Sequence, residues 1–164
     1  MKKVCLYILV LFILTSCSRT YYIVRHAEKA APNAAMSSNV PLSDAGVARA
    51  FALKEELQNK KITTIYSTNT IRTKSTAEPL SSALGVPVGI YGPMPDPAFM
   101  RKLRDGKGNV LIVGHSNTVD DVVNMLTGEK KYSDLKDSVY NHLYVVKINR
   151  GGKVVKTEQL IYGK

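Results

Sequence analysis

The residues in this sequence that are best suited to chemistry are Arg25, His26, Arg72 and His115. Arginine forks match the oxygens of a phosphoryl group with paired, charge-assisted hydrogen bonds. They also oppose the negative charge that builds during phosphoryl transfer. A neutral histidine can attack phosphorus and form a covalent phosphohistidine, and a second histidine, if protonated, can donate to the phosphoryl oxygens. If the four side chains meet in space, they predict phosphoryl chemistry.

A metal site is the other use that these histidines suggest. His26, Glu28 and His115 carry donor types that zinc accepts. The neighbouring arginines would repel a cation, however, and no cluster of Asp or Cys completes a ligand set. The sequence therefore predicts no metal and no other cofactor.

Predicted strands alternate with predicted helices along most of the chain, and this pattern must position the four side chains. Such alternation predicts an α/β fold, a three-layer sandwich in which a mainly parallel sheet has helices on both faces. The last two strands form a hairpin that adds an antiparallel edge. Ligands bind beyond the carboxyl ends of the strands in such sheets, where Arg25, His26 and His115 stand. The predicted strands are 21–24, 62–66, 86–91, 110–113, 143–148 and 154–161, and the predicted helices start near 43, 69, 97 and 116.

The ends and faces of the helices follow from residue preferences. Ser43 and Ser116 are predicted to cap the first and last helix. Pro79 lies inside the second helix and predicts a kink or a break there. The first helix is expected to bury Val47, Ala50, Leu53 and Leu57, which recur at helical spacing.

Four short motifs, in order, resemble the histidine phosphatase (phosphoglycerate mutase-like) superfamily. Arg25-His26-Ala27 is similar to the Arg-His-Gly motif that ends the family's first strand. The resemblance covers about residues 21 to 127, and the small size is similar to the short phosphatase branch. The other three motifs are Leu42-Ser43-Asp44-Ala45-Gly46, the block 67–77 with its Arg72 and Thr76-Ala77, and Val113-Gly114-His115-Ser116.

The resemblance implies a phosphatase and gives each residue a role. His26 is the phosphorylated nucleophile, Arg25 and Arg72 bind the phosphoryl group, and His115 completes the pocket. The implied substrates are small phosphomonoesters or phosphoramidates. The chain lacks the family's longer insertions, which argues against a mutase that must hold two phosphorylated positions of one substrate. Ala27 replaces the family's glycine, and this departure keeps open a second hypothesis, an inactive lipid-anchored module that binds phosphorylated ligands.

The proton donor for the leaving group stays open. The acid-phosphatase branch has an Asp directly after the second histidine, where this chain has Ser116. The candidates are Glu28, Asp96 and Asp120, of which Glu28 is nearest to the nucleophile in sequence. Water, or a leaving group that needs little protonation, does without any acid. His142 matches no motif and is interpreted as structural.

The first residues predict export and attachment to a membrane. Two lysines precede the apolar run 4–14, which is shorter than the roughly 20 residues that a spanning helix needs and is typical of a signal peptide. Leu14-Thr15-Ser16-Cys17 resembles the bacterial lipobox, in which the cysteine carries lipid; an uncleaved anchor is the alternative. The expected organisation is a signal peptide at 1–16, lipidated Cys17 with a linker to 20, and a phosphatase domain at 21–164 on the exported side of the bacterial cell envelope.

The charge of the chain favours anionic partners. The net charge is +10, and removal of Lys2 and Lys3 with the leader leaves 21 basic against 13 acidic residues, or +8. Such an excess attracts anions, although it also fits a soluble surface. The basic residues are scattered without interleaved aromatics, so nucleic-acid binding is not predicted. The expected partners are a small phosphorylated substrate and, through the lipid anchor, the membrane.

Overall fold

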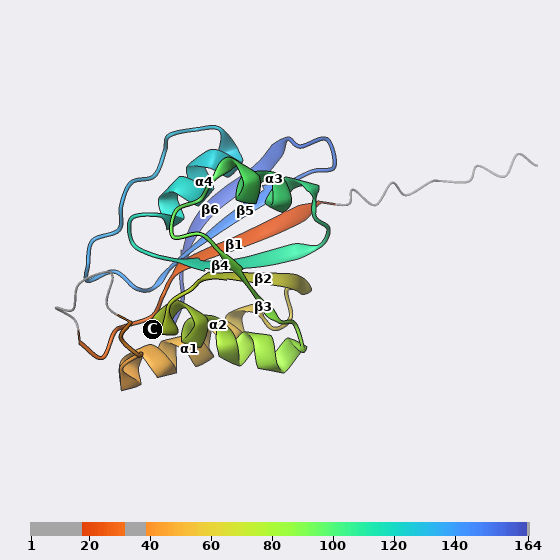
Figure 1. Ribbon diagram of the computed structural model, residues 1–164. Coiled ribbons are helices and arrows are strands. Elements are labelled where there is room, and N and C mark those ends of the chain that lie inside the picture. Colours follow the sequence, from red (N-terminus) through yellow and green to blue (C-terminus); the bar gives the residue numbers. More distant parts are fainter. Residues whose placement is uncertain (1–17, 32–38, 164) are drawn as a thin grey trace, which may run out of the picture.

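The computed structural model describes residues 18–31 and 39–163, and it consists of a six-stranded sheet between two layers of helices (Figure 1). The strand order is β3-β2-β4-β1-β5-β6. The first four strands in this order are parallel, whereas β5 runs antiparallel to β1 and β6 antiparallel to β5. This confirms the predicted three-layer α/β class with an antiparallel closing hairpin. The elements are β1 (Arg19–Arg25), α1 (Asp44–Leu57), β2 (Ile62–Thr68), α2 (Ile71–Leu84), β3 (Val88–Tyr91), α3 (Pro97–Asp105), β4 (Asn109–Gly114), α4 (Val119–Thr127), β5 (His142–Ile148) and β6 (Val154–Ile161).

Each face of the sheet has its own apolar core. Figure 1 shows α1 and α2 on one face and α3 and α4 on the other. Because neighbouring residues of a strand point to opposite faces, β1, β2, β4 and β5 each contribute to both cores. The first core contains Val24, Leu53, Leu57, Ala77, Leu80 and Leu111, and the second contains Ile23, Leu103, Ile112, Val122, Val123 and Tyr144.

The first turn of α1 packs through Gly46 and not through Val47. Val47 is 45% exposed, so its predicted place in the core is wrong. A Cβ atom on Gly46 would lie 2.3 Å from the carbonyl oxygen of Glu28, and only a glycine allows this approach. Ser43 caps the helix as predicted, because its Oγ accepts a hydrogen bond from the Gly46 amide. The segment after β1 is thereby fixed against the start of α1.

Pro79 does not divide α2. The helix runs as one element from Ile71 to Leu84 and ends at Gly85, which has a φ of 65°. The proline removes one backbone hydrogen bond, because it has no amide to donate to the carbonyl of the preceding turn. The buried face of the helix keeps the segment helical. The prediction of a break is therefore wrong.

The start of α4 also differs from the prediction. The cap residue is Thr118 and not Ser116, and residues 115–118 form a turn between β4 and the helix. The Thr118 hydroxyl accepts a hydrogen bond from the His115 amide at 3.1 Å, which closes this turn before the helix begins. His115 therefore stands in a turn beyond the carboxyl end of β4.

The first strand begins earlier than predicted, at Arg19. Arg19 and Thr20, expected to be linker, belong to β1 and pair with β5. Within the residues that the structure describes, no helix is both long enough and apolar enough to cross a membrane. The predicted signal peptide and Cys17 lie outside the described residues.

Candidate active site

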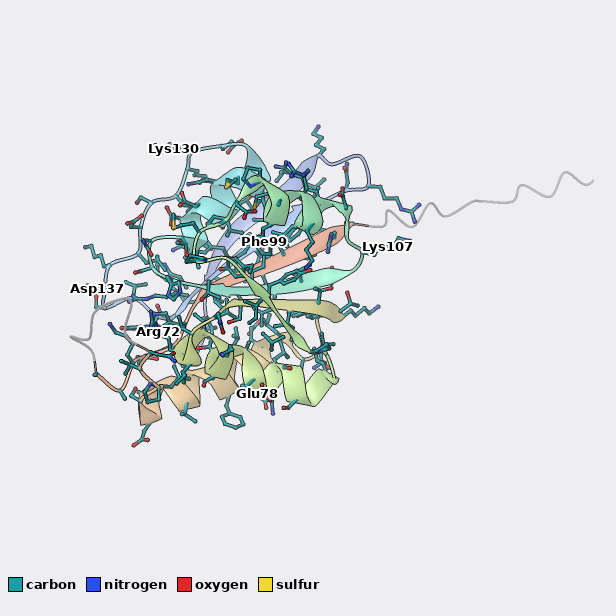
Figure 2. The ribbon with its side chains drawn as sticks, in the orientation of Figure 1. Arg72, Glu78, Phe99, Lys107, Lys130 and Asp137 are labelled. Atoms are coloured by element: carbon teal, nitrogen blue, oxygen red, sulfur yellow. The ribbon has the colours of Figure 1, made fainter. Side chains whose placement is uncertain are left out.

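The four sequence-predicted side chains meet at the carboxyl end of the parallel strands. Arg25 ends β1 and is level with Gly114, which ends the neighbouring strand β4. The His26 amide donates to the Gly114 carbonyl at 2.9 Å, and the rings of His26 and His115 lie 5.5 Å apart, edge to face. Arg72, in the first turn of α2, is at the same end of the sheet (Figure 2).

The tautomer of His26 is set by its neighbour in the chain. Its Nδ1 lies 2.7 Å from the carbonyl oxygen of Ala27. A carbonyl only accepts, so Nδ1 carries the proton and Nε2 keeps its lone pair. Burial, together with the charges of Arg25 and Arg72, lowers the pKa of His26 to about 3. The ring is therefore neutral at pH 7 and its Nε2 is available for attack.

Ala27 fits its place without backbone strain. Among the described residues, Lys61 is the only non-glycine residue with a positive φ, so Ala27 does not need the freedom of a glycine. Its side chain is fully buried, and its amide donates to the Thr76 hydroxyl at 2.9 Å. That hydroxyl donates to the Arg72 carbonyl at 2.7 Å, which connects the nucleophile's segment to the helix of the second arginine.

His115 is neutral in the free site. Its Nε2 lies 2.8 Å from the Thr68 hydroxyl at the end of β2. Burial and the charges of Arg72 and Arg25 lower its pKa to about 4. Its Nδ1 is buried without a hydrogen-bond partner in the described part of the chain, as is Nε of Arg25. Buried polar atoms normally have partners, so these two nitrogens indicate a place for a ligand.

Arg25 is held by a segment that the sequence did not single out. This segment, residues 129–141, joins α4 to β5 and carries no helix or strand. Arg25 Nη1 donates to the carbonyls of Lys136, Asp137 and Val139 at 3.0, 3.0 and 2.9 Å. Its guanidinium also lies over the ring of Tyr140, with Cζ 4.1 Å from the ring centroid.

Tyr140 is the functional candidate that the sequence analysis missed. Its ring centroid lies 6.1 Å from that of His26, so one aromatic side chain contacts the arginine and lies beside the nucleophile. No motif marks Tyr140, and its segment has no apolar periodicity. The Leu135 amide anchors the segment by donating to the Ser116 carbonyl at 2.8 Å.

Glu28, the first candidate for a proton donor, is engaged in an ion pair. Arg49 Nε lies 2.8 and 2.9 Å from the two Glu28 oxygens, and its Nη2 lies 2.7 Å from Oε1. Burial raises the pKa of Glu28, but the hydrogen bonds and charge of Arg49 outweigh burial and lower it overall. Arg49 also donates to the Tyr162 and Gly163 carbonyls. This carboxylate therefore ties α1 to the C-terminal segment and is poorly suited to deliver a proton.

The other candidates have separate surroundings. Asp96 caps α3, where it accepts from the Phe99 amide at 2.7 Å. Asp120 is buried in the first turn of α4, and burial raises its pKa. His142 opens β5, where its ring lies edge-on to Tyr144. None of the three is among the groups that shift the pKa of His26 or His115.

The arrangement suits a phosphoryl group beside a neutral imidazole. Two guanidiniums supply positive charge, and the Nε2 of His26 supplies a lone pair. In the described residues, no group of three histidine, cysteine, aspartate or glutamate side chains is placed to hold a metal ion. The fold and the site thus have the features that phosphoryl transfer through a histidine nucleophile requires.

Part of the chain is similar to a known family of phosphatases. Residues 21–92 match the model of the histidine phosphatase superfamily (branch 1), a range that includes Arg25, His26 and Arg72. This match, together with the fold shared with solved phosphatases, supports a phosphatase. Curated protein sequences give no match.

Solved structures with this fold include several phosphatases. The protein histidine phosphatase SixA in complex with tungstate is 19% identical, with a TM-score of 0.69 over 87% of this chain and 96% of that one. The alpha-ribazole phosphatase of Shigella flexneri is 14% identical, with a TM-score of 0.66 over 88% and 96%. The mycobacterial glucosyl-3-phosphoglycerate phosphatase is 12% identical, with a TM-score of 0.59 over 89% and 99%. At these identities the similarity concerns the fold.

Proposed function

We propose that this protein hydrolyses small phosphomonoesters or phosphoramidates through a covalent phosphohistidine on His26. The observation that carries the proposal is the 2.7 Å hydrogen bond from His26 Nδ1 to the Ala27 carbonyl. It leaves Nε2 unprotonated within a site that holds two arginines. Such a nitrogen is a nucleophile at neutral pH without help from a base.

The reaction has two steps. In the first, Nε2 of His26 attacks phosphorus, the bond from phosphorus to the leaving oxygen or nitrogen breaks, and the leaving group takes the electron pair and a proton from solvent, which the water of the second step later returns. In the second, water attacks the phosphohistidine, the P–N bond breaks, and inorganic phosphate leaves with His26 neutral again. Arg25 and Arg72 oppose the charge on the phosphoryl oxygens in both steps. His115 takes up a proton as the dianion binds and donates it as a hydrogen bond.

The surroundings of His26 favour a leaving group that needs little protonation by the protein. Glu28 is paired with Arg49, and Ser116 follows His115 where the acid-phosphatase branch has an Asp. Asp137 is the carboxylate beside Arg25, at 3.7 Å from Nη2, and its side chain is fully exposed. A phosphoramidate such as phosphohistidine, whose nitrogen is protonated by solvent, suits this site better than an alkyl phosphate. The fold similarity to the histidine phosphatase SixA supports the same substrate class.

We further propose that the enzyme is lipid-anchored through Cys17 on the exported side of the bacterial cell envelope. The support is the apolar run 4–14 followed by Leu14-Thr15-Ser16-Cys17. The test is metabolic labelling with radioactive palmitate in a bacterial host. The full chain should take up label, and Cys17→Ser should not; equal labelling of both would refute the anchor.

The catalytic proposal is tested with p-nitrophenyl phosphate and a phosphohistidine peptide. His26→Ala should lose at least a thousandfold in kcat, because it removes the Nε2 that attacks phosphorus, and the Nε2 of His115 is engaged with the Thr68 hydroxyl. His142→Ala is the matched control and should keep the parent rate. If the parent releases no phosphate but binds vanadate, the alternative of an inactive binding module is correct. An unchanged rate in His26→Ala would refute the assignment of the nucleophile.

A further inference from the structure

The end of the sheet opposite the candidate active site collects basic side chains. Lys107 lies at this end, and Arg72 and Asp137 lie at the other (Figure 2). The amino end of β1, the turn between α3 and β4, the start of β2 and the β5–β6 turn all meet here. Their cations are Arg19, Lys61, Arg104, Lys107, Arg150 and Lys153, which we call the basic end.

The basic end contains a cavity of about 490 Å³. Four of its lining residues are cations, and Asp105 is the carboxylate among them. Its lining residues are Ser18, Arg19, Tyr21, Arg104, Asp105, Gly106, Lys107, Gly108, Ile148, Asn149, Arg150 and Gly152. A hollow with this lining attracts a phosphate group more strongly than scattered surface lysines would.

Arg19 is the fixed part of this cavity. Its Nε donates to the Gly108 carbonyl at 2.8 Å, and its Nη1 donates to the Leu103 carbonyl. A Cβ atom on Gly106 would lie 2.5 Å from Arg19 Nη2, so the turn passes close over the guanidinium. These contacts orient the arginine but leave its charge unneutralised.

The basic end lacks internal compensation of its charge. In the described part of the chain, none of its six cations lies within 4 Å of a carboxylate. Lys107 and Arg150 are exposed and lie in turns that have positive φ at Gly108 (76°) and Gly152 (77°). Repulsion between these like charges favours an external anion, because an anion relieves the repulsion as it binds.

The path of the chain identifies the source of that anion. Ser18 lines the cavity, and β1 begins at Arg19, two residues after Cys17, the proposed lipid anchor. A membrane that holds a lipid on Cys17 therefore lies next to the basic end. We propose that the basic end docks on the phosphate headgroups of an anionic phospholipid bilayer, with one headgroup phosphate in the cavity. The choice of a bilayer rests on the proposed membrane attachment, whereas the anion site itself does not.

Docking by this end sets the direction of the active site. β1 runs from Arg19 at the cavity to Arg25 at the candidate active site. At about 3.3 Å per residue this strand spans roughly 20 Å. Docking therefore holds the phosphoryl-binding end away from the lipid and open to soluble or protein-borne substrates.

The test is hydrogen exchange of the full chain in vesicles of phosphatidylcholine, with or without phosphatidylglycerol. Amides of residues 104–108 and 149–153 should exchange several-fold more slowly in the anionic vesicles. The double variant Lys107→Glu, Arg150→Glu should lose this difference, whereas Lys130→Glu, Lys131→Glu, at exposed lysines outside the basic end, should keep it. Exchange of β1 and β4 amides reports in the same experiment whether each variant is folded.

Three results would overturn the proposal. The first is equal exchange in the two vesicle compositions. The second is protection that survives the charge reversal at Lys107 and Arg150. The third is protection of the basic end by added RNA alone, in vesicles without anionic lipid, which would assign the surface to nucleic acid. None of these results depends on phosphatase activity, so the docking proposal can be refuted while the catalytic proposal stands, and the reverse.

Discussion

A single proton decides whether His26 can attack, and its position follows from the carbonyl of the next residue. The Nδ1 proton bonds to Ala27, and nearby arginine charges oppose a second proton on Nε2. The pKa of about 3 for His26 and of about 4 for His115 places both titrations far below the ordinary 6.5. We predict that NMR titration of the free enzyme finds no change in either ring between pH 8 and pH 5. A midpoint near 6.5 for His26 would contradict the proposed charge state.

The ion pair with Arg49 indicates that Glu28 stabilises the fold and does not donate the proton. Because its carboxylate is paired with Arg49, Glu28→Gln should lower the free energy of unfolding by about 1 kcal/mol and change kcat less than twofold. Arg49→Met should destabilise in the same way, since it removes the partner. Urea unfolding and steady-state kinetics measure the two effects. A hundredfold loss of kcat in Glu28→Gln, with unchanged stability, would instead make Glu28 the proton donor.

At the scale of the element, the segment 129–141 completes the site without any regular structure. Its three carbonyls orient Arg25, and the Tyr140 ring covers the guanidinium. A cation over an aromatic face is worth about 0.5–2 kcal/mol, so Tyr140→Leu should weaken vanadate binding roughly 3- to 30-fold. Tyr140→Phe keeps the ring and should bind within twofold of the parent. Equal loss in both variants would mean that the hydroxyl, and not the ring, acts in the site.

The elements also show what the sequence predicted and what it did not. Strand ends were predictable because apolar runs stop where Arg25 and His115 begin, and in a parallel sheet such ends meet. The hydrogen-bond partners of the site residues were not predictable, because they come from distant positions in segments without periodicity. Arg49 reaches Glu28 across 21 positions, and the carbonyls that hold Arg25 lie more than 110 positions away. The start of α4 was misplaced because the Thr118 hydroxyl bonds to the His115 amide, which residue preferences do not reveal.

At the scale of the whole molecule, burying two neutral histidines makes stability depend on pH. Their pKa values are lower in the folded protein than in the unfolded chain, so the unfolded chain binds more protons below pH 6.5. Stability is therefore full above pH 6.5 and falls as the pH drops toward 4. Each histidine should lower the free energy of unfolding by about 2 kcal/mol as the pH falls from 7 to 5. Urea unfolding at both pH values measures this loss. The variant His26→Asn should show a smaller loss, because the part that comes from His26 is absent.

A bound oxyanion should reverse part of this loss, which connects the stability of the whole molecule to its site. Negative charge beside His115 raises the pKa of that ring. At pH 5 the ring should therefore be protonated in the oxyanion complex but neutral in the free protein. Tungstate should therefore stabilise the protein more at pH 5 than at pH 7, measured as the shift in unfolding midpoint at a fixed tungstate concentration. His115→Asn keeps the arginines but has no imidazole, so its shift should be nearly independent of pH. Equal shifts at both pH values in the parent would mean that His115 stays neutral when an oxyanion binds.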